Sequence, residues 1–253
     1  MTSTTRALSF GTVSEDYDRF RPGPPAAAVD WLVPAGARAV VDVGAGTGAL
    51  TAQLAARVAE VTAVEPDERM RAVLARRVPA ATVLAGTAEA LPLEDRSQDA
   101  VLASSAWHWV DPERAVPEAA RVLRPGGTLG VVWTGMDREV AWVGELQQTI
   151  RARLSPPVVG ADRGPRRLEL PASAADAFSP VEGPHIVRFT HRFTRDALLG
   201  LAGTYSAMII HPEKASLLEA IRTALSEDPR FATAAGVEIP MISRCFRARR
   251  TTG

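Results

Sequence analysis

Cysteine and histidine are scarce in this sequence. Its 253 residues include one cysteine, Cys245, and four histidines. A single thiol cannot form a disulfide within the chain, and such cysteine usage is typical of a reducing compartment. The histidines are scattered, and no cluster shows the spacing of zinc ligands. We therefore expect no disulfide and no metal site.

Net charge and long apolar runs are lacking as well. Lysine and arginine together number 29 and the acidic residues also number 29, so the formal net charge is zero. Without a long-range positive field, nucleic acid and anionic membranes are not expected as partners. Residues 1–20 lack the apolar core of a signal peptide, and no apolar run reaches membrane-spanning length. We expect a cytoplasmic protein, present as a monomer or a weak homodimer.

The composition is that of a globular protein with a substantial core. Apolar residues make up 46% of the chain and charged residues 23%. Between residues 26 and 133, strand patterns alternate with helix patterns. Strands are expected at 39–43, 61–65, 82–85, 100–103 and 128–133, and helices at 26–32, 49–57, 68–77 and from 112 to about 123. Five strands linked by helices predict a parallel, doubly wound α/β sheet.

After residue 134 the pattern changes. Helices are expected at 139–154, 195–201 and 213–225, and strands at 185–193 and 237–247, which alternate in polarity as antiparallel strands do. We expect one domain, with a cofactor-binding core at 26–133. Residues 134–236 would form a substrate-covering region with one core strand, and residues 237–248 the last strand. The helices would make a small cap over the carboxyl ends of the strands, where open α/β sheets bind ligands.

Three glycines, Gly44, Gly46 and Gly48, directly follow the first strand of the core. Glycine there permits a tight turn and lets a ligand reach bare backbone at the start of the next helix. Read literally, the spacing also matches the dinucleotide fingerprint, with Glu65 about 20 residues on as the ribose-binding acid. A nicotinamide-dependent oxidoreductase and a turn without any ligand are therefore both open at this point.

Four motifs in order resemble those of the class I S-adenosylmethionine-dependent methyltransferases. The family's acid followed by Gly-x-Gly-x-Gly is matched at 42–48, its acidic second-strand end at 64–67, its loop after strand three at 86–93, and its helix-to-strand turn at 121–127. Dehydrogenases usually carry an apolar residue where Asp42 stands. The resemblance implies a mostly parallel, Rossmann-like sheet of seven strands with an antiparallel last strand. It also implies S-adenosylmethionine as cofactor and S-adenosylhomocysteine as product.

The resemblance indicates which residues would contact each part of the cofactor. Asp42 would attract the ammonium of the cofactor's tail, Glu65 would accept from the ribose hydroxyls, and Arg21 would pair with the tail's carboxylate. Thr87 stands where many relatives carry an aspartate for the adenine amine, so adenine contacts are expected on Ala88 and Glu89. The cofactor-binding residues implied are Tyr17, Arg21, Asp42, Gly44, Ala45, Gly46, Glu65, Pro66, Thr87, Ala88, Glu89 and Ser104.

Two further stretches are similar to a subgroup of small-molecule methyltransferases that includes the trans-aconitate methyltransferases. They are Phe10-Gly11 with residues 17–22, and the aromatic segment at 106–111. In an extended segment, Trp107 and Trp109 would share one face and wall the acceptor pocket, with His108 on the other face. The alternative is that both tryptophans belong to the core. Tyr17 and Arg21 likewise either close over the cofactor or form an ordinary turn before Pro22.

His108 is the candidate catalytic residue, because histidine titrates near neutral pH and serves as a general base. It is equally consistent with a hydrogen-bond donor to an acceptor carboxylate, or with a structural histidine. The expected substrate-binding residues are Trp107, His108, Trp109, Tyr205 and Met208, the last two on the cap. Packing of one cap helix on another is the alternative for Tyr205 and Met208.

The expected function is methylation of a small molecule, with oxygen in a carboxylate or a hydroxyl as the acceptor atom. Two alternatives belong to other classes: an NAD(P)-dependent oxidoreductase, and a protein that binds S-adenosylmethionine without turning it over. Nucleic-acid or protein methylation is not expected, since the chain lacks a basic tail and an Asn/Asp-Pro-Pro-Tyr motif after the fourth strand.

Overall fold

The computed structural model describes residues 14–152, 167–209, 211–233 and 235–251. The chain divides into two compact units. The sheet unit comprises residues 23–134, 165–187 and 243–253, and the helix unit comprises residues 1–22, 135–164 and 188–242. Phe10 and Gly11, which form part of the resemblance above, lie outside the described residues.

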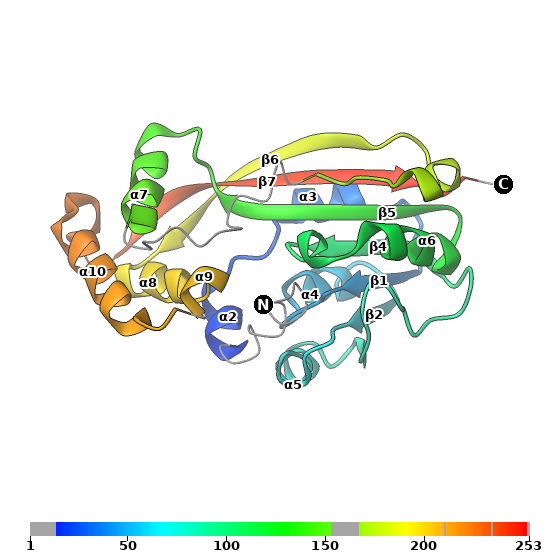
Figure 1. Ribbon diagram of the computed structural model, residues 1–253, viewed down its shortest axis with the longest axis horizontal. Coiled ribbons are helices and arrows are strands. Elements are labelled where there is room, and N and C mark those ends of the chain that lie inside the picture. The colour runs from blue at the N-terminus through cyan, green and yellow to red at the C-terminus, as the bar shows by residue number, and fades with distance from the viewer. Residues whose placement is uncertain (1–13, 153–166, 210, 234, 252–253) are drawn as a thin grey trace. The chain divides into compact units, whose positions relative to one another are not determined.

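A seven-stranded sheet organises the fold, with the strand order β3-β2-β1-β4-β5-β7-β6 (Figure 1). The strands are β1 Ala39–Val43, β2 Glu60–Val64, β3 Thr82–Leu84, β4 Gln98–Ser104, β5 Leu123–Met136, β6 Glu182–Phe193 and β7 Val237–Arg249. The pairs β3-β2, β2-β1, β1-β4 and β4-β5 are parallel. Beside β5, the backbone N–H of Gly126 donates to Arg250 O and that of Arg250 donates to Gly127 O, an antiparallel exchange. The predicted sheet and its antiparallel last strand are confirmed.

The register of the central strands brings their carboxyl ends to one edge. Val43 of β1 lies opposite Val64 of β2, and Asp42 lies opposite Leu102 of β4. All five residues of β1 are buried, as expected for a β-branched run in the middle of a parallel sheet. The residues that follow β1, β2 and β4 therefore emerge side by side, and they include the glycine turn.

Helices cover the sheet inside the sheet unit. They are α3 Ala26–Leu32, α4 Ala49–Ala55, α5 Glu68–Arg77 and α6 Pro112–Val122, with short 3-10 turns η2 Trp107–Trp109 and η3 Ala172–Ala177. Asp67 and Asp111 begin α5 and α6 by accepting backbone N–H bonds with their carboxylates. One apolar cluster joins α6 to the sheet, and a second joins α3 and α4 to it. The sheet is thus packed by helices through two separate cores.

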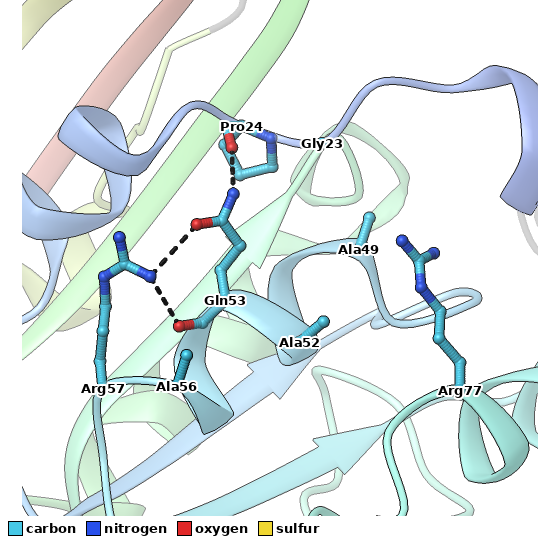
Figure 2. Close-up of a pocket in the computed structure, with 8 residues that line it drawn as sticks. All are labelled: Gly23, Pro24, Ala49, Ala52, Gln53, Ala56, Arg57 and Arg77. Carbon is cyan, nitrogen blue, oxygen red and sulfur yellow. Dashed lines mark hydrogen bonds between the residues drawn. The ribbon is translucent and has the colours of Figure 1, made fainter.

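One face of α4 lines a groove of about 330 Å³ (Figure 2). The lining residues are Gly23, Pro24, Ala49, Ala52, Gln53, Ala56, Arg57 and Arg77. Gln53 donates to Pro24 O at 2.7 Å, and Arg57 donates to Gln53 O at 2.8 Å while pairing with Asp30. These contacts tie the chain before α3 to the exposed side of α4, and no residue that the sequence assigns to the site lines the groove.

The helix unit has its own apolar core. Its helices are α2 Ser14–Phe20, α7 Ala141–Ala152, α8 Arg195–Gly203, α9 Ser206–Ile209 and α10 Lys214–Glu227, followed by the turn η4 Pro229–Phe231. Phe193, Leu198, Met208, Ile221 and Phe231 are fully buried in this core. The segment expected to form a helical cap is therefore built as helices, and its placement over the strand ends stays a prediction.

Element boundaries differ from the predicted ones by a few residues. β5 begins at Leu123, directly after α6, so the turn at 124–127 belongs to the strand that was expected from 128. β2 ends at Val64, which leaves Glu65 just beyond the strand. Within the described ranges, no helix combines the length and the apolar character needed to cross a bilayer. That part of the chain also contains no group of His, Cys, Asp or Glu placed to hold a metal ion.

Candidate functional site

The turn after β1 exposes backbone at the carboxyl edge of the sheet unit. Gly44 has a φ of +64°, and a Cβ there would lie 2.6 Å from Ala106 Cβ, so both conformation and space require glycine. The N–H of Gly44 donates to Val64 O at 2.9 Å, which fixes the turn against the end of β2. Gly44, Ala45 and Gly46 are half-exposed, so a ligand can reach their backbone.

Glu65 connects the glycine turn to the end of β2. Its carboxylate accepts from the N–H of Gly46 at 2.9 Å through Oε2 and from the N–H of Asp67 at 2.9 Å through Oε1. The side chain is buried, and this burial raises its pKa even though the two backbone N–H groups favour the charged form. The structure thus brings together Gly46 and Glu65, which are 19 residues apart in the chain.

Asp42 is a buried acid, and only one of its two carboxylate oxygens accepts a hydrogen bond from a described residue. Thr51 Oγ1 on α4 donates to Oδ2 at 2.6 Å, whereas Oδ1 has no hydrogen-bond partner among the described residues. Burial raises the pKa of Asp42 to about 7, the Thr51 hydrogen bond opposes this, and the nearby charge of Glu65 adds to it. A buried oxygen without a donor is costly, so this position suits a ligand or water that donates a hydrogen bond.

The remaining cofactor positions in the sheet unit have mixed environments. Pro66 and Thr87 are exposed and Ser104 is half-buried at the end of β4, whereas Ala88 is buried in the core under α6. Glu89 accepts from the N–H of Asp111 at 2.9 Å through Oε1, a contact that the sequence did not predict. Part of its bonding capacity therefore supports the start of α6.

Tyr17 and Arg21 belong to the helix unit. Arg21 donates from Nε to Thr204 Oγ1 at 3.1 Å and from Nη2 to Thr204 O at 2.9 Å. Its guanidinium also lies 5.6 Å from the centre of the Tyr205 ring. Tyr17 lies in α2, and its side chain is outside the described part of the structure. Arg21 thus fastens the chain after α2 to the end of α8.

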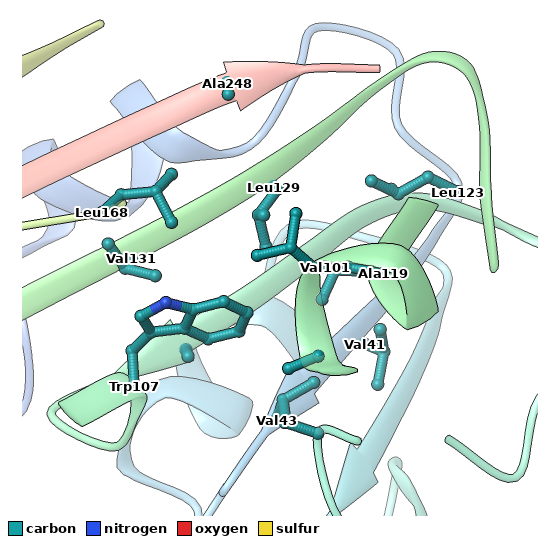
Figure 3. Close-up of a cluster of buried hydrophobic side chains, with 14 of the residues drawn as sticks. Val41, Val43, Val101, Trp107, Ala119, Leu123, Leu129, Val131, Leu168 and Ala248 are labelled. Atoms are coloured by element: carbon teal, nitrogen blue, oxygen red, sulfur yellow. The ribbon is translucent and has the colours of Figure 1, made fainter. Parts of the chain in front are cut away.

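The aromatic segment after β4 is not extended, which corrects the expectation that Trp107 and Trp109 share one face. Residues 107–109 form the 3-10 turn η2, in which successive side chains point about 120° apart. Trp107 is 6% exposed and packs among Val41, Val43 and Val131 in the core (Figure 3). Its environment corresponds to the core alternative, and we assign it a packing role. Trp109 is half-buried.

His108 pairs with a residue that the sequence did not single out. The indole Nε1–H of Trp133 donates to His108 Nδ1 at 3.2 Å across 25 residues of sequence. The His108 ring also lies 4.8 Å from the ring of Trp109, centre to centre. Trp133 belongs to β5, so only the pairing of β4 with β5 brings it beside η2, and no local pattern marks it.

The two acceptor candidates on the helix unit differ in exposure. Met208 is fully buried in that unit's core, which matches the alternative of packing between helices. Tyr205 is half-buried, and Arg21 lies over its ring. The expectation that Met208 binds substrate is therefore corrected to a packing role, and substrate binding by Tyr205 stays a prediction.

Comparison with known proteins gives a consistent set of relatives. The family model described as "Methyltransferase domain" matches residues 41–131. An uncharacterized methyltransferase of Mycobacterium tuberculosis is 43% identical over 246 residues, covering 96% of this chain and 96% of the relative. A solved structure from Anaeromyxobacter dehalogenans, assigned as a type II methyltransferase, is 31% identical with a TM-score of 0.66, covering 91% of this chain and 98% of that one. A malonyl-(acyl-carrier protein) O-methyltransferase of Methylococcus capsulatus is 36% identical over 157 residues, 57% of this chain and 55% of that protein.

Proposed function

The chain belongs to the class I S-adenosylmethionine-dependent methyltransferases, and we propose that it transfers the cofactor's methyl group to a carboxylate or hydroxyl oxygen of a small molecule. The observation that carries the proposal is the edge formed by Asp42, Gly44, Gly46 and Glu65. There, half-exposed backbone lies between two buried carboxylates, and one of these carboxylates has an oxygen without a donor. Both units would serve this one activity as a single methyltransferase domain.

The residues at this edge fit the chemistry of the cofactor. Its tail carries an ammonium, which would satisfy Asp42 Oδ1 either directly or through water. Each oxygen of Glu65 accepts one backbone N–H, and a carboxylate oxygen has a second lone pair for a ribose hydroxyl. The glycine turn leaves no side chain between the ligand and the backbone of Gly44 and Gly46. When bound, the cofactor would supply a methyl group already activated by the sulfonium.

The remaining cofactor assignments are proposals of the same kind. Thr87 and Pro66 are exposed and would contact the adenosine, with Ala45, Ala88, Glu89 and Ser104 contributing backbone or side-chain contacts nearby. Arg21 and Tyr17 would hold the cofactor's tail if the Thr204 contacts of Arg21 are exchanged on binding. The chemistry needs little beyond positioning, because in-line displacement from a sulfonium is accelerated chiefly by holding the two reactants close.

The acceptor is proposed to meet His108 and Trp109, which follow β4 at the same edge as the glycine turn. An O-methyltransferase is among the relatives, matched over 157 residues and 57% of this chain, and this supports oxygen as the acceptor atom. The motif at 106–111 supports a small acceptor of the trans-aconitate methyltransferase kind.

Calorimetry with purified protein tests the proposal. We expect binding of S-adenosylmethionine and S-adenosylhomocysteine, and no binding of NAD or NADP. Tight NAD binding without either sulfur compound would exclude the methyltransferase assignment. Cofactor binding with no methyl transfer to any small acid, phenol or alcohol would instead favour a binding protein without turnover.

A further inference from the structure

Arg121 on α6 holds the loop that follows β3. An arginine side chain has five N–H donors, and five acceptor atoms surround this one. Nε donates to Glu118 Oε2 at 2.9 Å, and Nη2 donates to Glu118 Oε1 at 2.7 Å and to Leu91 O at 3.0 Å. Nη1 donates to Leu93 O at 2.9 Å and to Asp95 Oδ1 at 2.6 Å. Arg121 thus makes every hydrogen bond that its side chain can donate.

Glu118 and Arg121 together form a clamp on this loop. Glu118 Oε1 also accepts from the N–H of Leu91 at 2.7 Å, and the hydrogen bonds from Arg121 hold the pKa of Glu118 below its ordinary value. The N–H of Arg96 donates to Arg121 O at 2.9 Å. Arg96 has a φ of +52°, a left-handed conformation that a residue with a side chain keeps only where the surrounding structure fixes it. The loop is therefore held by the clamp from Leu91 to Arg96.

The same loop carries the turn at 87–90, whose residues are proposed to contact adenine. The N–H of Ala90 donates to Thr87 O at 3.3 Å and closes the turn. Glu89 at its tip accepts from the N–H of Asp111 at 2.9 Å, at the start of α6. Leu91 follows the turn directly and is tied to the clamp through both its N–H and its C=O. The turn is thus attached to α6 at its tip and at its base.

α6 is a rigid support for both attachments. Its buried face packs into the core of the sheet unit, and the residues of this face are at most 1% exposed: Ala115, Val116, Ala119 and Val122. Glu118 lies seven residues after Asp111, and Arg121 three residues further, so all three line one side of the helix. At a rise of about 1.5 Å per residue, the two attachments are roughly 10 to 15 Å apart along the helix. A turn fixed at two such separate points cannot shift without breaking hydrogen bonds.

We propose that Arg121 and Glu118 are positioning residues that determine the selectivity for the cofactor's adenine base, because they fix the turn at 87–90. This inference rests on the proposed function. Adenine presents an amine at C6 and an acceptor nitrogen at N1, whereas hypoxanthine presents a carbonyl and an N–H at the same two places. A turn held in one position matches its donors and acceptors to one of these patterns and leaves groups unpaired against the other. A clamp with only a structural role would instead affect the binding of both bases equally.

Amide hydrogen exchange of the cofactor-free protein tests the clamp independently of any ligand. Arg121→Lys keeps the charge but supplies three donors in place of five, and Glu118→Gln replaces one acceptor oxygen by an amide nitrogen. In both variants the N–H of Leu91 should exchange roughly tenfold faster than in the wild type. The N–H groups of β1 should exchange as slowly as in the wild type, which shows that the variants are folded. Unchanged protection of Leu91 in both variants would overturn the inference.

Calorimetry with S-adenosylhomocysteine and S-inosylhomocysteine, its deaminated form, tests the selectivity. We expect the wild type to bind the adenine compound more tightly. Arg121→Lys and Glu118→Gln should reduce the ratio of the two affinities by roughly two- to tenfold, as for the loss of one ordinary hydrogen bond. Arg124→Lys is the matched control, because Arg124 pairs with Asp99 at 2.6 Å, away from the loop, and this variant should keep the wild-type ratio.

The ratio of affinities separates a positioning role from a structural one. A destabilised variant has less folded protein, which lowers both affinities by the same factor and leaves their ratio unchanged. An unchanged ratio in Arg121→Lys and Glu118→Gln would therefore overturn the inference while the proposed function stands. Equal affinity of the wild type for the two compounds would overturn it in the same way. A wild type that binds neither compound would exclude the proposed function, and the inference with it.

Discussion

The backbone N–H of Gly46 donates a 2.9 Å hydrogen bond to the carboxylate of Glu65. This bond links the glycine turn to the residue that directly follows the second strand. The other carboxylate oxygen accepts from the N–H of Asp67, which begins the following helix. A change at Glu65 therefore alters two turns as well as any contact with a ribose. This double role determines how the variants at this edge should behave.

Replacing Glu65 by alanine should weaken binding of S-adenosylmethionine by roughly 1 to 3 kcal/mol, because hydrogen bonds to a charged group are lost. Calorimetry gives the affinity, and thermal unfolding reports the loss of the two backbone contacts. Glu60→Ala is a suitable control, since Glu60 is exposed at the other end of the same strand. Equal affinity in the wild type and Glu65→Ala would mean that Glu65 is only a structural residue.

The pH dependence of stability should change in Asp42→Asn. The folded-state pKa of Asp42 is raised from 3.8 to about 7, so the folded protein binds this proton more tightly than the unfolded chain. The contribution to the free energy of unfolding is complete below about pH 4 and is lost as pH rises through 7. An asparagine at this position does not titrate, so Asp42→Asn does not lose stability in this way as pH rises. The free energy of unfolding of Asp42→Asn minus that of the wild type should therefore rise by up to about 4 kcal/mol between pH 4 and 8. Urea titrations at both pH values measure the difference, and a constant difference would contradict the shift.

Cofactor affinity should also depend on pH through Asp42. An ammonium binds the ionised carboxylate, so wild-type affinity should fall by about tenfold per pH unit as pH drops below 7. Proton release on binding at pH 6 should appear as a heat that differs between buffers of different ionisation enthalpy. Asp42→Asn should bind more weakly and lose both effects. A wild-type affinity that stays flat from pH 5.5 to 7 would show that the ligand does not contact this acid.

Gly44→Ala should destabilise the protein and impair cofactor binding. The added Cβ meets Ala106 Cβ at 2.6 Å and also requires a left-handed backbone at φ +64°. The conformation alone costs roughly 1 to 2 kcal/mol, and the overlap adds to this. Gly126→Ala isolates the first contribution, because Gly126 has a φ of +78° and an added Cβ there meets nothing within 4 Å. Chemical denaturation of both variants gives the comparison, and equal losses would contradict the close contact.

Trp107 and Trp109 should respond differently to alanine. Trp107→Ala leaves a cavity in the core of the sheet unit and should cost about 3 to 5 kcal/mol of stability. Trp109→Ala, at a half-buried position, should cost less stability but lower turnover with the methyl acceptor. Denaturation curves and kinetics on the same preparations separate the two effects. Wild-type turnover in Trp109→Ala would place the acceptor elsewhere.

Local sequence signals determined the element order, the sheet and the family. Buried β-branched runs predict strands, Asp111 followed by Pro112 predicts a helix start, and the three glycines predict the turn after the first strand. Each signal acts over a few residues, so it does not depend on the rest of the fold. Asp42 and Glu65 were named from the resemblance to the methyltransferase family, and the parallel pairing of β1 with β2 then places Asp42 beside the end of β2 that precedes Glu65.

Only the tertiary structure decided which contacts the other candidate site residues make. Trp107 is core because α6 and the sheet close around it, and Arg21 reaches Thr204 across 183 residues. His108 accepts a hydrogen bond from Trp133, a partner that strand pairing supplies. The pKa of Asp42 depends on burial that all the surrounding elements create together. Such contacts join distant parts of the chain, and their energies arise from packing and desolvation, which no short pattern of residues encodes.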